Sequence, residues 1–354
     1  MVQSLIDPKE IDPRKHLIES QQVDDAYLRE VFELAAFMKR NEGRVSHMLR
    51  DKIVVTAFSQ ESTRTRGSFE AAALRLGAGV ITFTDAEKTS SVAKGEDLED
   101  TIKTLSGYGD FIVLRHSAND SSRIAVQFSN GVPIINGGAG SEQHPTQALL
   151  DLFTILEQKG RLERLKIGLV GDLCRGRTIN SLVYLLSRYP GNEYYFIGPE
   201  ESPMNEGIRR HLSERGIQFS EYNSLDEYLG WADVWYITRP QLNMMNGDAE
   251  KAAFRQKMRE FRVTGENVGK MRGDAIIMHP FPRDSSLLDG VPMPEIAKEV
   301  DCDPRAVYFE QSLNGKYVRM AILKMMNDHN YPVHGIGKVG QRIGEGVRRL
   351  LIYR

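Results

Sequence analysis

Apolar positions in the first part of the chain alternate between short strand-like runs and helical faces. The runs are β-branched and uninterrupted, which is typical of strands buried on both sides. Strands are expected at 53–58, 111–114 and 132–135. Helices are expected at 24–40, 120–129 and 146–158. This alternation of strand and helix predicts a parallel sheet covered by helices.

A second series of the same kind occupies the rest of the chain. Strands are expected at 167–170, 194–197, 234–237 and 275–278. Helices are expected at 179–186, near 204–215 and near 314–328, and 247–272 is a charged, partly helical excursion. The fold class is therefore predicted as α/β, with two doubly wound parallel-sheet domains, the first completed by C-terminal helices. The expected domains are 1–145 plus 312–354, and 146–311.

The amino-acid composition limits which partners, cysteine sites and cellular location are expected for the protein. The chain has 354 residues, of which 41% are hydrophobic and 27% charged, with a formal net charge of -2. This balance argues against nucleic-acid or membrane partners, and no apolar run reaches membrane-spanning length. Two cysteines exclude a disulfide framework and a four-cysteine metal site. The N-terminus mixes acidic and basic residues, unlike a targeting peptide, so a cytoplasmic location is expected, with no metal and no cofactor.

The segment 62–66, Ser-Thr-Arg-Thr-Arg, carries the clearest chemical signal. It follows a predicted strand and precedes apolar residues with helical spacing, which end at Gly77. Hydroxyls and guanidiniums therefore crowd a helix start, where unpaired N–H groups and the helix dipole favour an anion such as phosphate. The alternative is that the hydroxyls only cap the helix and the arginines are solvated.

Further polar residues follow the other predicted strands. They are Arg115 and His116, His144 and Gln147, Arg177, Arg239 and Gln241, and the segment 279–283. Ligands of such sheets bind at the carboxyl ends of the strands. Each cluster alone is compatible with an ordinary surface, whereas five clusters at five strand ends favour one shared site. The polar loop with Ser90 and Lys94 is compatible with a solvated loop.

These motifs, in this order, resemble the carbamoyltransferase family from about residue 15 to 328. The motifs are S-T-R-T-R-x-S-F-E at 62–70, T-S-x-x-x-K-G-E at 89–96, R-H at 115–116, H-P-T-Q-x-L-L-D at 144–151, G-D-x-x-x-G-R-T at 171–178, T-R-x-Q at 238–241 and H-P-x-P-R at 279–283. The loop lysine and the last two motifs point to the aspartate branch. The Asp-x-x-Ser-Met-Gly run and loop cysteine of the ornithine branch are missing.

The resemblance implies carbamoyl transfer from carbamoyl phosphate to L-aspartate, a step of pyrimidine biosynthesis. It implies that the phosphate is held by Ser62, Thr63, Arg64 and Thr65. It implies that the carbamoyl oxygen is bound by Thr65, Arg115 and His144, and the carbamoyl amide by Gln147 and the carbonyls of Pro280 and Phe281. The aspartate carboxylates are assigned to Arg177, Arg239 and Gln241. Ser90 and Lys94 would come from the neighbouring subunit of a homotrimer, Lys94 reaching both substrates.

The sequence also departs from the family pattern. Gln60 stands where a glutamate usually bridges the two domains, and Met244 stands where its arginine partner is expected. Glu61 adds a negative charge beside the phosphate pocket, which Arg66 or another basic group would have to neutralise. Another amine acceptor and a non-catalytic anion-binding paralogue therefore stay open. A regulatory chain and the role of the 333–354 tail, either a packed or a partner-binding helix, are not determined.

Overall fold

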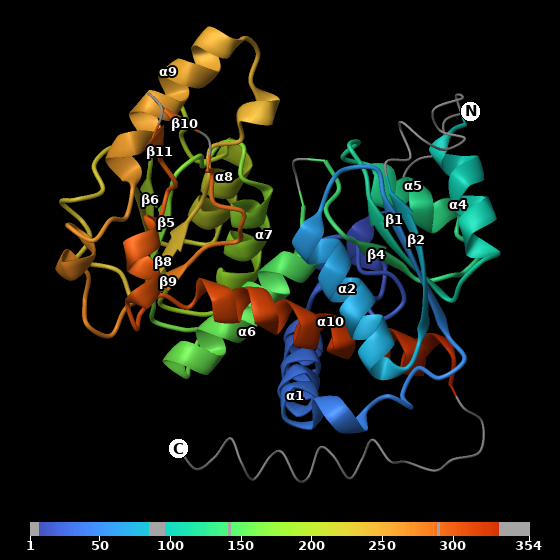
Figure 1. Cartoon of the computed structure of the whole chain (residues 1–354). Coiled ribbons are helices and arrows are strands. Elements are labelled where there is room, and N and C mark those ends of the chain that lie inside the picture. The colour runs from blue at the N-terminus through green and yellow to red at the C-terminus, as the bar shows by residue number, and fades with distance from the viewer. Residues whose placement is uncertain (1–6, 85–95, 141–142, 286, 289–290, 333–354) are drawn as a thin grey trace.

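The computed structural model describes residues 7–84, 96–140, 143–285, 287–288 and 291–332. Two parallel sheets form its framework, as the sequence predicted (Figure 1). The first has the order β2 (Gly79–Thr84), β1 (Ile53–Phe58), β3 (Phe111–Arg115), β4 (Ile134–Asn136). The second has the order β7 (Phe219–Tyr222), β6 (Glu193–Ile197), β5 (Lys166–Val170), β8 (Val234–Ile237), β9 (Ile276–Met278). Two short strands, β10 (Leu287–Leu288) and β11 (Val291–Pro292), pair with each other antiparallel.

Helices cover both sheets. They are α1 (Asp25–Asn41), α2 (Thr63–Leu76), α4 (Leu98–Ser106), α5 (Ser121–Phe128), α6 (Pro145–Lys159), α7 (Arg177–Leu186), α8 (Glu206–Glu214), α9 (Asp248–Met258) and α10 (Tyr308–Asn330). Figure 1 shows α6 and α10 in the middle, between the two sheets. α10 packs against α1, α2 and α6, so the last described helix returns to the first sheet. This is the C-terminal completion that the sequence predicted.

The sequence analysis missed β2, β7 and α4, as well as the two-residue strands β10 and β11. β2 and β7 are edge strands, each paired on one side only, and both are half-exposed. An edge strand does not need the uninterrupted apolar run of a central strand, so its pattern is weak. α4 buries only two apolar residues, Ile102 and Leu105. The missed strands β2 and β7 therefore lack the continuous buried run by which the central strands were predicted.

The turn from α2 to β2 explains one glycine. Gly77 ends α2 with a left-handed backbone, φ 88°, and its N–H and that of Ala78 bond back to the last helical turn. A Cβ at Gly77 would lie 1.9 Å from the carbonyl oxygen of Ser46. Only glycine fits there, and the helix stop predicted at this residue is confirmed.

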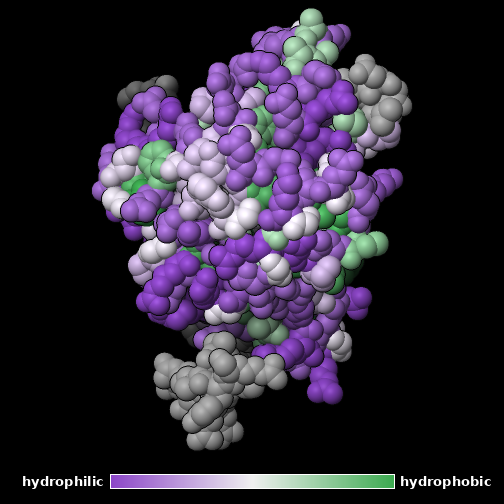
Figure 2. Space-filling view, turned by 90° about the vertical axis from the view of Figure 1, so that its left-hand side faces the viewer, coloured by the Kyte–Doolittle hydropathy of each residue, from purple (hydrophilic) through white to green (hydrophobic). Residues whose placement is uncertain are grey.

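The core is apolar and the surface is mostly polar. One apolar cluster contains residues of both sheets, including Val54, Phe111, Leu169 and Tyr236. The face shown in Figure 2 is largely hydrophilic, with small apolar groups scattered over it. Among the described residues, no helix has the length and apolar character needed to cross a bilayer.

Candidate active site

The carboxyl ends of the strands of both sheets open into one cavity of about 880 Å³. His116 and Arg283, which belong to the predicted clusters, do not line it, and Arg283 pairs with Asp301 instead. All the described residues that the family resemblance assigns to the substrates line it. They are Ser62, Thr63, Arg64, Thr65, Arg115, His144, Gln147, Arg177, Arg239, Gln241, Pro280 and Phe281. Ser90 and Lys94 lie outside the described residues. Residues up to 219 positions apart, Ser62 and Phe281, therefore converge on one space because parallel strands end at the same edge.

The start of α2 presents its polar groups to this cavity. Ser62 is the residue before the helix, and its side chain makes no capping hydrogen bond among the described residues. The structure therefore does not support the alternative in which the Ser62 hydroxyl only caps the helix. The hydroxyl of Thr65 lies 3.2 Å from Nε2 of His144, which itself precedes α6. Hydroxyls and helix N–H groups at this point suit a phosphate.

Four arginines concentrate positive charge in the cavity. Within the described part of the chain, no carboxylate forms an ion pair with Arg64, Arg115, Arg177 or Arg239. Burial, followed by the charges of Arg177, Arg239 and Arg64, lowers the pKa of Arg115 to about 9. Burial and Arg239 lower the pKa of Arg177 to about 10. These guanidiniums repel one another, and anions that bind in the cavity would relieve this repulsion.

His144 brings a neutral donor to the same place. Burial and the charges of Arg177, Arg115 and Arg319 hold the pKa of His144 well below its usual range. Its main-chain N–H donates to Oγ of Ser181 at 2.9 Å, which fixes the start of α6. The imidazole is therefore uncharged at neutral pH, where it is suited to hydrogen-bond an oxygen that gains negative charge.

Comparison of the sequence with protein-family models identifies the family of proteins to which this site belongs. The model of the aspartate/ornithine carbamoyltransferase carbamoyl-P binding domain matches residues 15–157, and the model of the Asp/Orn binding domain matches 163–326. The chain belongs to the aspartate/ornithine carbamoyltransferase family. The family resemblance seen in the sequence is confirmed, and the two matched regions contain the two parallel sheets.

Individual carbamoyltransferases agree with this assignment. The aspartate carbamoyltransferase catalytic subunit of Methanocaldococcus jannaschii is 44% identical over 320 residues, covering 89% of this chain and 99% of the relative. Aspartate carbamoyltransferase 1, chloroplastic, of Pisum sativum is 42% identical over 313 residues, which cover 88% of this chain and 78% of the relative. A structure of the M. jannaschii catalytic subunit has a TM-score of 0.79, covering 90% and 99%. Trypanosoma cruzi aspartate transcarbamoylase, in complex with carbamoyl phosphate and aspartate, has a TM-score of 0.78 at 33% identity, covering 88% and 95%.

The residues that depart from the carbamoyltransferase pattern also lie at the cavity. Gln60, Glu61 and Met244 line it, and Glu61 is the single carboxylate among its described lining residues. Arg66, considered as a partner of Glu61, lies 3.6 Å from Glu70 instead. This follows from helical geometry, since Glu70 is one turn after Arg66 on α2. Arg66 is therefore not the group that neutralises Glu61.

The sequence analysis missed the contribution of Asp172 and Arg175. Asp172 is fully buried, and its Oδ2 accepts a hydrogen bond from the main-chain N–H of Gln241 at 2.9 Å. Its Oδ1 lies 3.2 Å from Nη1 of Arg175, which lines the cavity. Asp172 thus joins the loop after β5 to the loop after β8. Both residues fall within the 171–178 motif, the signal by which they were detectable.

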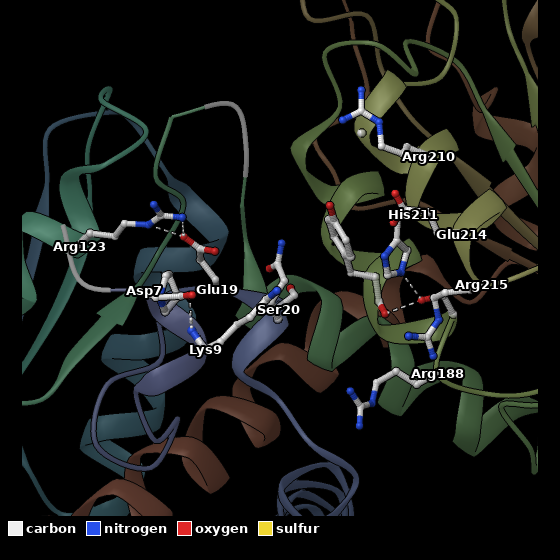
Figure 3. Close-up of a pocket in the computed structure, with 15 residues that line it drawn as sticks. Asp7, Lys9, Glu19, Ser20, Arg123, Arg188, Arg210, His211, Glu214 and Arg215 are labelled. Atoms are coloured by element: carbon white, nitrogen blue, oxygen red, sulfur yellow. Dashed lines mark hydrogen bonds and ion pairs between the residues drawn. The ribbon is translucent and has the colours of Figure 1, made fainter. Parts of the chain in front are cut away.

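A second cavity of about 700 Å³ lies between two walls (Figure 3). One wall is formed by the short helices η1 (Pro8–Glu10) and η2 (Ser20–Gln22) with α5, and the other by α7 and α8. Figure 3 shows Glu19 and Arg123 on one wall, joined by an ion pair of 2.6 Å. Arg188 and Arg210 on the other wall pair with Asp25 and Glu206. These three arginines have acidic partners, which the four arginines of the cavity at the strand ends lack among the described residues.

Proposed function

We propose that this chain transfers the carbamoyl group of carbamoyl phosphate to the amine of L-aspartate, which gives N-carbamoyl-L-aspartate and phosphate, a step of pyrimidine biosynthesis. One observation supports this most strongly: four guanidiniums, which have no acidic partner within the described residues, share a cavity with the hydroxyls of 62–65 and the neutral His144. The substrates carry a phosphate and two carboxylates. Relatives whose structures contain carbamoyl phosphate, aspartate and N-(phosphonacetyl)-L-aspartic acid add support.

The proposed reaction needs neither a covalent intermediate nor a metal. The amine nitrogen attacks the carbamoyl carbon, a tetrahedral oxyanion forms, and the bond to the phosphate oxygen breaks. The amine loses a proton, which the departing phosphate accepts. Thr65, Arg115 and His144 stabilise the oxyanion, while Arg64 and the helix start neutralise the leaving dianion.

The remaining residues orient the substrates. Gln147 and the carbonyls of Pro280 and Phe281 hold the carbamoyl amide, and Arg177, Arg239 and Gln241 hold the carboxylates of aspartate. Bidentate contacts from arginine suit carboxylates, which supports this part of the proposal. The proposed division places the phosphate half of the site in 1–145 plus 312–354, and the aspartate half in 146–311.

We further propose a homotrimer in which Ser90 and Lys94 complete the site of a neighbouring subunit. Lys94→Ala and His144→Ala trimers should each be inactive. After subunit exchange, some mixed sites contain both native residues, so activity should return. Absence of rescue, with exchange verified by mass spectrometry, would argue against a shared site.

The acceptor is tested directly with a panel of amino acids and carbamoyl phosphate. Formation of carbamoyl-aspartate above all other products supports the proposal. A preference for another amine would identify a carbamoyltransferase with a different acceptor, an alternative motivated by Gln60, Glu61 and Met244. Stabilisation by carbamoyl phosphate without turnover would identify the non-catalytic paralogue. Fractionation tests the expected cytoplasmic location, since the plant relatives are named chloroplastic.

A further inference from the structure

Asp151 ends the motif at 144–151 but has no role in the reaction as proposed above. It lies on α6, one turn after Gln147, and its side chain is fully buried. A buried carboxylate is costly unless several hydrogen bonds satisfy it. The groups that donate hydrogen bonds to Asp151 therefore indicate which part of the site this buried carboxylate serves.

Three donors from three elements converge on the Asp151 carboxylate. Its Oδ1 accepts from Nε2 of Gln147 at 2.9 Å and from Nε2 of Gln311, on α10, at 2.7 Å. Its Oδ2 accepts from the hydroxyl of Tyr236, on β8, at 2.8 Å. The carboxylate thus joins α6 to α10 and to the second sheet.

Each of these donors leads to a different part of the cavity. Gln147 lines it directly. Oε1 of Gln311 accepts from the main-chain N–H of His279 at 2.8 Å, at the start of the loop that carries Pro280 and Phe281. Tyr236 stands three residues before Arg239. Asp151 is therefore one hydrogen bond away from Gln147 and two hydrogen bonds away from the start of the Pro280–Phe281 loop.

The carboxylate also determines which way the Gln147 amide points. An amide has one accepting end and one donating end. Since Nε2 of Gln147 donates to Asp151, its Oε1 is the end left to accept a hydrogen bond from a ligand. A carbamoyl NH₂ group is such a donor. The opposite orientation would place Oε1 against a carboxylate oxygen, which is repulsive.

We infer that Asp151 is a positioning residue, which orients Gln147 and, through Gln311, the Pro280–Phe281 loop to bind the carbamoyl amide. The inference rests on the proposed transfer reaction and adds to it a residue that touches no substrate. It assigns Asp151 to the carbamoyl end of the substrate. The phosphate end, held at the start of α2, lies outside these three hydrogen bonds.

Protonation of Asp151 would disturb this arrangement. An ionised carboxylate accepts all three bonds, whereas a carboxylic acid must donate from one oxygen and therefore breaks or reverses one of them. Burial raises the pKa of Asp151 to about 7, opposed by the bonds from Gln311, Tyr236 and Gln147 and by the charge of Arg319. Arg319 on α10 and the Tyr236 hydroxyl on β8 are the charged and titratable groups that face it.

Asp151→Asn tests the inference, and Thr154→Val is its matched control. Thr154 is also fully buried on α6, and its hydroxyl accepts from Nδ2 of Asn314 on α10 at 3.1 Å. It joins the same two helices but, unlike Asp151, has no hydrogen-bond partner among the described residues that lines the cavity, since it bonds the Leu150 carbonyl and Asn314. Two stable probes separate the ends of the substrate: inorganic phosphate, and phosphonoacetamide, which adds an amide.

We expect Asp151→Asn to weaken phosphonoacetamide binding at least tenfold in calorimetry and to change phosphate binding less than twofold. Thr154→Val should change neither by more than twofold. The acid limb of kcat/KM for carbamoyl phosphate near pH 7 should disappear in Asp151→Asn. In a chain that already carries Gln147→Ala, Asp151→Asn should weaken phosphonoacetamide binding little further. The two losses should therefore not add in a double-mutant cycle.

Equal weakening of both probes, or an unchanged pH profile, would overturn the positioning role. These outcomes are separate from a failure of the proposed function, because wild-type turnover is measured in the same preparations. A wild-type chain that binds phosphonoacetamide through Asp151 but makes no carbamoyl-aspartate would overturn the reaction and retain Asp151 as an organiser of amide binding.

Discussion

Oγ1 of Thr65 lies 3.2 Å from Nε2 of His144, which joins the first turn of α2 to the residue before α6. The two residues are 79 positions apart, and each is nearly buried. Their contact places a hydroxyl and a neutral imidazole beside the same guanidiniums. This pairing combines hydrogen-bond donors for an oxyanion with charge for a leaving phosphate.

Thr65→Val should lower kcat by about 100-fold, because one well-placed donor to an oxyanion contributes roughly 3 kcal/mol. Steady-state kinetics with both substrates saturating measures this. Combined with His144→Ala, the change should be less than additive if the contact couples the two groups. Independent, additive losses would show that the two side chains act separately.

Arg64→Ala should abolish the stabilisation of the folded chain by phosphate, whereas Arg66→Ala should retain it. Arg64 lines the cavity, while Arg66 lies beside Glu70 on the helix. Both variants remove one guanidinium from the first turns of α2, so they are matched in charge and position. Thermal unfolding with and without phosphate measures the effect. Equal loss in both variants would contradict the assignment.

Arg239→Met should raise the KM for aspartate at least tenfold while increasing the melting temperature of the ligand-free chain. The charge of Arg239 contributes to lowering the pKa values of Arg64, Arg115 and Arg177, so its removal relieves repulsion in the empty cavity. Kinetics and thermal unfolding without ligand test both parts. A lower melting temperature would show that Arg239 stabilises the fold through other contacts.

Asp151 should make stability depend on pH in a defined window. Folding raises the pKa of this carboxyl from 3.8 to about 7, so the folded state holds a proton that the unfolded state has lost. The free energy of unfolding of the wild type, relative to Asp151→Asn, should therefore fall as pH rises from about 4 to about 7 and level off above. Urea unfolding across this range measures the difference, and Thr154→Val should follow the wild type. If the difference in unfolding free energy between the wild type and Asp151→Asn did not change with pH, the raised pKa of Asp151 would be contradicted.

The central elements were predictable because their apolar surface is continuous. β1, β3, β5, β6 and β8 are buried, and their runs stand out in the sequence. β2 and β7 were not predicted, since both are partly exposed along their length, whereas the buried edge strands β4 and β9 were predicted. Site residues were predictable for a related reason: Arg115, Arg177 and Arg239 follow central strands or open the next helix, where a parallel sheet collects its ligands.

Other features depended on contacts between distant residues. Arg66 and Arg64 are the same residue type two positions apart, yet one meets Glu70 and the other faces the cavity. Asp151 and Gln311 are 160 positions apart, and no local pattern indicates their 2.7 Å bond. Helix phase and long-range packing decide such pairs, and neither is contained in a short window of sequence.

The amino-acid sequence by itself determined two doubly wound parallel sheets, the strand ends that carry polar residues and the family to which they belong, because strand burial and helix starts are local properties of the chain. Only the tertiary structure decided that the arginines share a cavity, where none of the described carboxylates pairs with them, and that a buried carboxylate on α6 orients the Gln147 amide. Charge repulsion and hydrogen-bond direction act through space, so they take effect only when folding brings distant residues together.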